Sequence, residues 1–228
     1  LSERALAECS YDSQLEVVTN TRDRKNPRAY QQGRYTWISH YATGTLDIGQ
    51  QFWWVYRHNG DINFLREQAY PMLRSGMEFY RSLAGGKGDD GFYHIYPTNV
   101  HEYFWGVRDG IMDLAAIRGN VPLAIRAAEI LGVNEDLRAA WRELLDNLAP
   151  YPMGSDPGSK ELAAGVLAGE AWSAGHYVDV KGGHNGEQVW MTPVFPFEHY
   201  TLETKDAELA RGARRTYDAL PRRRRFLT

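Results

Sequence analysis

Apolar residues recur at three- and four-residue spacings along most of this chain, the pattern of amphipathic helices that share a core. The first such stretch starts at Tyr41 and continues past Trp53. A second begins after the turn Asn59-Gly60-Asp61, where Asp61 suits a helix N-cap. Pro71 lies inside this second stretch and predicts a kink or a fresh helix start. Helical spacing returns in residues 109–131, 134–148 and 204–220.

Several segments interrupt this helical pattern. Gly119, Asn120 and Pro122 predict that the helix over 109–131 is bent or split. Residues 151–200 are rich in glycine and are predicted to be mostly irregular, with a candidate short helix at 160–167. Residues 1–35 are polar and weakly patterned, which indicates an irregular entry segment. The arginines at 222–225 are typical of a solvated tail and do not by themselves predict nucleic-acid binding.

The order of elements is helix, tight turn, helix and long loop, and then the same again. Short connections produce antiparallel helix pairs, so the predicted fold class is all-α. Three of the long loops, at 35–40, 93–109 and 182–190, are rich in aromatic and ionisable residues. Residues 93–109 show neither helical nor strand spacing and are predicted to form a loop that lines a pocket. We expect the three loops to meet at one rim, with Trp37, Glu102 and His184 around a common cleft.

Composition narrows the choice of partners. The net charge of −3 gives no argument for nucleic acid or an anionic membrane, and no apolar run is long enough to span a bilayer. The single cysteine excludes an internal disulfide framework. No metal-binding motif or cofactor motif is recognisable, so no metal and no cofactor are predicted. The aromatic content of 13% fits either a large aromatic core or a pocket for a ring-shaped ligand.

Several runs of residues, in their order and spacing, resemble the six-hairpin glycosidases, and within them the α-L-fucosidases of glycoside hydrolase family 95. The resemblance is strongest over residues 36–150. It rests on the segments at 37–40, 52–67, 69–73, 78–80, 90–97 and 127–133. It implies an (α/α)6 barrel, of which residues 1–228 would be part. The upstream Asn-x-Asn segment and the late Asp of the family cannot be placed here, so we expect the chain to be a piece of a longer barrel.

The resemblance also implies a catalytic residue. Carried over, the general acid of the family is Glu102, preceded by Pro97-Thr98-Asn99-Val100-His101, although the family more often has Ser-Pro where this chain has Val100-His101. Such hydrolysis needs one carboxylic acid and one carboxylate, and aromatic neighbours favour the protonated form of an acid. Asp109 is a weaker candidate for the second carboxylate. The predicted substrate contacts are Trp37, His40, Asn99, His101, Trp105, Arg108, Asp109, His184 and Trp190.

Other interpretations of these residues stay open. Glu102 could be a solvated loop residue, and His101 a packing residue. Arg108 and Asp109 could be a structural ion pair at a helix start, and one of Trp53 and Trp54 should belong to the core. The favoured function is an inverting glycoside hydrolase acting on plant or microbial polysaccharide. The alternatives are a catalytically incomplete relative that binds carbohydrate and a helical interaction module. A secreted or periplasmic location is expected if the full-length protein carries a signal peptide, and a cytoplasmic one otherwise.

Overall fold

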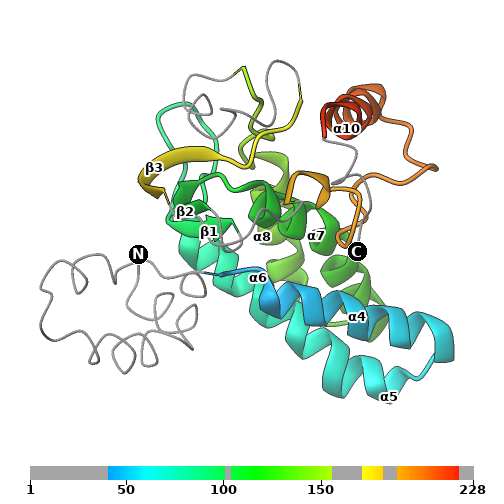
Figure 1. The fold of residues 1–228 in the computed structure, drawn as a ribbon. Helices are drawn as coiled ribbons and strands as arrows, with labels where there is room; N and C mark the ends of the chain where they lie inside the picture. The colour runs from blue at the N-terminus through cyan, green and yellow to red at the C-terminus, as the bar shows by residue number, and fades with distance from the viewer. Residues whose placement is uncertain (1–40, 101–103, 156–170, 182–188, 221–228) are drawn as a thin grey trace, which may run out of the picture.

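The computed structural model describes residues 41–100, 104–155, 171–181 and 189–220. Helices dominate these ranges (Figure 1). The longer ones are α4 (Gly44–Asn59), α6 (Tyr70–Ala84), α7 (Ile111–Leu131), α8 (Glu135–Asp146) and α10 (Ala207–Ala219). Shorter helical turns are α5 (Ile62–Phe64), the π-helical turn η2 (Leu65–Ala69) and the 3-10 turn η4 (Val189–Met191). Within the described ranges, every helix is too short or too polar to span a bilayer.

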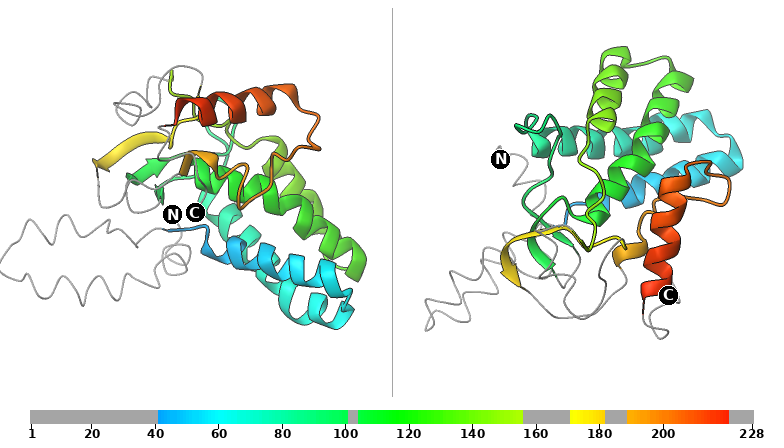
Figure 2. Two further views of the ribbon diagram at one scale, coloured as in Figure 1. Left: turned by 45° about the vertical axis from the view of Figure 1, so that its right-hand side comes forward. Right: turned by 90° about the horizontal axis from the view of Figure 1, so that it is seen from above.

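Two helix pairs form the body of the molecule, α4 with α6 and α7 with α8 (Figures 1 and 2). The chain reverses after α4 at Gly60 and after α7 at Gly132, and both glycines have the left-handed backbone that ends a helix (φ 67°). The Asp61 side chain accepts hydrogen bonds from the N–H groups of Asn63 and Phe64, which confirms it as an N-cap. The predicted helical hairpins are therefore present.

The two internal prolines have different consequences. Pro71 is the second residue of α6, just after η2, and the backbone at Ala69 and Tyr70 is right-handed helical, so the helical run continues through this place and the predicted fresh start is wrong. Proline has no N–H to donate to the preceding turn, and the widened π-helical turn accommodates that loss. Pro122, in contrast, lies inside the single continuous helix α7, so the prediction that this helix is split is wrong. Most of α7 is buried, and packing on several sides outweighs the local preference.

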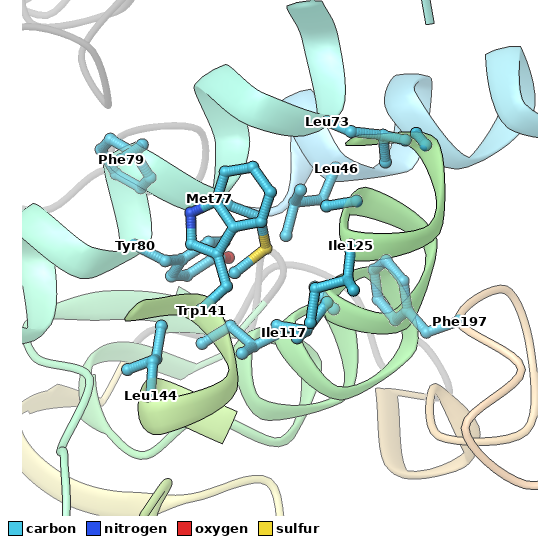
Figure 3. Close-up of a cluster of buried hydrophobic side chains, with 14 of the residues drawn as sticks. Leu46, Leu73, Met77, Phe79, Tyr80, Ile117, Ile125, Trp141, Leu144 and Phe197 are labelled. Atoms are coloured by element: carbon cyan, nitrogen blue, oxygen red, sulfur yellow. The ribbon is translucent and has the colours of Figure 1, made fainter. Parts of the chain in front are cut away.

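Side chains from all four paired helices form the main core (Figure 3). Trp141 of α8 is fully buried, and its indole N–H donates to Glu78 Oε1 at 2.7 Å, so its one polar atom is satisfied. Trp53 is buried and Trp54 is half-buried, so the expectation that one of this pair belongs to the core is confirmed. Other members of this core are Leu46, Leu73, Met77, Tyr80, Ile117, Ile125, Leu144 and Phe197.

A three-stranded antiparallel sheet lies at one end of the helix pairs (Figure 1). Its order is β1 (Thr98–Val100), β2 (Phe104–Arg108) and β3 (His176–Lys181). The prediction of a loop over 93–109 is therefore wrong at residues 98–100 and 104–108, and β3 is a strand within the stretch of 151–200 predicted to be mostly irregular. No alternation was visible in the sequence because all three residues of β1 are buried and because register shifts interrupt both strand pairings.

The sheet and the C-terminal helix share a second, smaller apolar core. We call it the hairpin core; its buried members include Val100, Phe104, Val107, Ile111, Ala174, Trp190, Leu209 and Ala213. Helix α10 begins at its N-cap Asp206, close to the start predicted for it. The candidate helix at 160–167 and the entry segment at 1–35 lie outside the described residues.

Close packing at Gly119 joins α7 to the segment after η4 and yields a prediction. A Cβ atom at Gly119 would lie 2.1 Å from the carbonyl oxygen of Phe197, which is backbone and cannot rotate away. Gly119→Ala should therefore lower the free energy of unfolding by about 1–3 kcal/mol, the usual cost of overpacking. Urea denaturation of the variant and of the parent would measure this difference in the free energy of unfolding.

Gly44→Ala is the matched control, because Gly44 also lies in a helix and a methyl group added there would meet no atom within 4 Å. Replacement of an unhindered helical glycine by alanine is neutral or stabilises by about 0.5–1 kcal/mol. Equal stability of the two variants would contradict the packing at Gly119.

Candidate active site

The hairpin formed by β1 and β2 carries the segment predicted to be catalytic. Val100 pairs with Phe104, so residues 101–103 connect the two strands. These three residues include His101 and Glu102 and lie outside the described part of the chain. Within the hairpin, the N–H of Gly106 donates to Asn99 Oδ1 at 3.0 Å, and Gly106 has a left-handed backbone (φ 65°). Asn99 is thus buried and secures the bulge in β2.

Asp109 closes the base of this hairpin. Its N–H donates to the carbonyl of Ile95 at 2.8 Å, and its Oδ1 accepts from the N–H of Ile95 at 3.0 Å. The residue has a left-handed backbone (φ 55°), which aspartate tolerates better than most residues and which turns the chain from β2 into α7. The backbone and the side chain of Asp109 together therefore fix where the hairpin begins.

The second oxygen of Asp109 faces positively polarised groups. His94 Nδ1 is 2.6 Å from Oδ2, Arg108 Nε is 3.6 Å away, and His176 Nδ1 is 3.7 Å away. The last two distances allow charge attraction without a hydrogen bond. Burial alone would raise the pKa of Asp109, but attraction from His176, hydrogen bonds from His94 and Ile95 N–H, and the charge of His94 outweigh it. They hold this pKa below its ordinary value.

His94 links Asp109 to a second acid. Its Nε2 is 3.0 Å from Asp90 Oδ2, so each ring nitrogen faces a carboxylate. Only the doubly protonated imidazole can donate to both at once. Asp90 belongs to the turn after α6, so the histidine ties this turn to the base of the hairpin.

Asp113, in the first turn of α7, is the second buried carboxyl at this place. Its Oδ1 accepts from the Tyr80 hydroxyl and its Oδ2 from the Thr98 hydroxyl, each at 2.7 Å. Burial raises the pKa of Asp113 to about 6, although both hydrogen bonds lower it. Asp109 and Asp113 are thus four residues apart in the chain, and their surroundings move their pKa values in opposite directions.

The structure places the predicted site residues in different ways. Trp37, His40, His101, Glu102 and His184 lie outside the described residues, so the expected convergence of the three loops is untested. Trp105 is in β2, and its side chain is outside the described part. Arg108 is half exposed. Asn99, Asp109 and Trp190 are buried, with contacts to the protein itself, so the structure does not support direct sugar contact for these three.

Two further findings concern Asp109 as a possible base and the possibility of a metal site. The carboxylate of Asp109 is about as buried as a side chain can be, at 1% exposed, and does not suit the activation of a water molecule. Within the described ranges, no three His, Cys, Asp or Glu side chains are grouped to hold a metal ion.

Sequence reasoning missed Asp113, Thr98 and Tyr80. One signal for Asp113 was available: it is the only acid in the otherwise apolar run from Ile111 to Ile117. An acid in such a run is buried and needs partners. Those partners are 15 and 33 residues away in the chain, so their identity depended on the fold.

The raised pKa of Asp113 predicts a pH effect on stability. The folded protein holds this proton more tightly than the unfolded chain, so the contribution is present at low pH and is lost as the pH rises from about 4 through 6. Asp113→Asn removes the titration. Relative to the parent, the free energy of unfolding of the variant should therefore rise by about 2 kcal/mol between pH 4.5 and 7.5.

Urea unfolding at both pH values measures this difference. Asp89→Asn, which alters an exposed carboxyl, is the control and should differ from the parent equally at both. A constant difference between Asp113→Asn and the parent would contradict the titration assigned to Asp113.

The chain has no match among curated proteins at a significant level. The sequence profile of the glycosyl hydrolase family 95 catalytic domain matches residues 2–219, nearly the whole chain. That domain is an (α/α)6 barrel, and the helix pairs described above agree with it, so the predicted all-α fold of the (α/α)6 class is confirmed. The resemblance that carried Glu102 over is confirmed at the level of the family. The chain belongs to glycosyl hydrolase family 95 and is a glycoside hydrolase domain.

Proposed function

We propose that this glycoside hydrolase cleaves α-L-fucosyl or closely related bonds of plant or microbial polysaccharide with inversion, and that Glu102 is its general acid. The observation that supports this most is the register of the hairpin. Val100 lies opposite Phe104, so Glu102 is the middle one of the three residues that connect two firmly held strands. A catalytic group has to be held within a fraction of an ångström, and a short connection between anchored strands suits that need.

The surroundings of the hairpin favour a protonated carboxyl group over an ionised one. Val100 and Phe104, the residues that flank the connection, are both buried in the hairpin core. An apolar environment disfavours the charged form of a carboxyl group and keeps its proton available near neutral pH. A general acid in an inverting enzyme donates that proton to the leaving oxygen while water attacks the opposite face of the sugar.

Carbohydrate is the substrate class that the family implies. We retain Trp37, His40, His101, Trp105, Arg108 and His184 as proposed contacts with the sugar. Aromatic rings present flat faces for sugar rings, and the polar side chains can hydrogen-bond to hydroxyl groups. We also propose that residues 1–228 belong to one catalytic domain.

Glu102→Gln tests the proposed role of Glu102. Glutamine keeps the shape of the side chain but has no transferable proton, so hydrolysis of a fucosyl oligosaccharide by the full-length enzyme should slow by about 10²–10⁴-fold. Affinity for the sugar should change little. A nitrophenyl α-L-fucoside should be affected much less, because its leaving group needs little protonation. Proton NMR of the first product should show an anomeric configuration opposite to that of the substrate.

Glu135→Gln, at an exposed position at the start of α8, is the matched control and should keep the parent rate. Unchanged turnover in Glu102→Gln would remove this residue from the mechanism. A parent protein that binds the oligosaccharide but never cleaves it would favour the carbohydrate-binding alternative.

A further inference from the structure

The Asp113 carboxylate connects three separate elements through two similar hydrogen bonds. It lies in the first turn of α7 and is 1% exposed. Its Oδ2 accepts from Thr98 of β1, and its Oδ1 accepts from Tyr80 of α6, each at 2.7 Å. The two donors are both hydroxyl groups on buried residues, but only Thr98 belongs to the hairpin.

The hairpin also lies directly on the start of α7, with little space between them. A Cβ atom at Gly110 would lie 2.6 Å from Val100 Cγ2 and 2.8 Å from Asp113 Oδ2. Because only hydrogen fits there, β1 and the first turn of α7 approach more closely than two ordinary side chains allow. A shift of β1 relative to α7 would therefore be transmitted to Val100, the last residue before the connection.

Thr98 also lies at a sensitive place along β1. It pairs with Val107 of β2 and precedes the connection by only two residues. The other anchor of the hairpin, Asp109 with Ile95, acts at its base. The bond from Thr98 to Asp113 is thus the side-chain hydrogen bond between β1 and α7 that is nearest to residues 101–103 among those described.

We propose that Thr98 and Asp113 are positioning residues for the reaction, which hold β1 against α7 and thereby set the place of the connection that carries Glu102. This inference rests on the role proposed for Glu102. Neither residue needs to touch the substrate. A displacement of about 1 Å at a catalytic group can slow a reaction by about 10²-fold, even when the change that causes it is remote.

The two hydroxyl donors allow a matched experiment. Thr98→Val and Tyr80→Phe each delete one hydroxyl, keep the size of the side chain and leave one oxygen of the same buried carboxylate without its donor. A purely structural role for this network predicts equal consequences. A positioning role predicts that only Thr98→Val impairs catalysis, because only Thr98 is on the hairpin.

In the full-length enzyme, with a fucosyl oligosaccharide as substrate, Thr98→Val should lower kcat by about 10–100-fold and change KM by less than about 3-fold. Tyr80→Phe should lose similar thermal stability and keep kcat within about 2-fold of the parent. Thr98→Ser retains the hydroxyl and should restore most of kcat. If Thr98→Val does not fold, Thr98→Ala deletes the same hydroxyl and provides the comparison.

Equal kcat values for Thr98→Val and Tyr80→Phe would overturn the inference, as would failure of Thr98→Ser to restore turnover. Glu102→Gln is assayed beside these variants. It separates a failure of the positioning role from a failure of the function proposed for Glu102. Slow turnover in Glu102→Gln together with equal kcat values for the two hydroxyl variants would refute positioning alone. Full turnover in Glu102→Gln would refute the proposed function itself.

Discussion

The attachment of the hairpin to the start of α7 depends on two buried carboxylates, Asp109 and Asp113. Asp109 binds the backbone of Ile95 and so closes the base of the hairpin. Asp113 binds Thr98 of β1 and Tyr80 of α6. Without them, the sheet and the helix pairs would be in contact mainly through apolar side chains, which give burial but little directional control. Hydrogen bonds to buried carboxylates supply that direction.

The same two residues show how the partners of a buried acid determine its charge. Asp109 faces a histidine at 2.6 Å and a backbone N–H, so the charged form is favoured and its pKa is lowered. Asp113 accepts from the hydroxyl groups of Thr98 and Tyr80, and burial raises its pKa to about 6. The negative charge of nearby Asp109 adds to this rise. Two acids four residues apart in the chain therefore make opposite contributions to the pH dependence of stability.

The sequence predicted the parts of the fold that follow from local patterns. The helix pairs and the N-cap at Asp61 could be recognised from spacing and from the chemistry of single residues. The hairpin could not, because a strand buried on both faces has no alternation and because bulges interrupt its register. Gly119 illustrates the same limit. It suggested a break in the helix, whereas its role is close contact with Phe197, 78 positions away in the chain.

The most direct test of the proposed anchoring is native-state hydrogen exchange at the amide of Ile95 in the full-length enzyme. This amide donates to the buried Asp109 carboxylate, outside any helix. If the carboxylates hold the hairpin as described, the Ile95 amide should be protected to nearly the same degree as core amides of α7, such as that of Ala116. Exchange as fast as that of Gly91, in the exposed turn before it, would show that the base of the hairpin opens freely and would contradict this account.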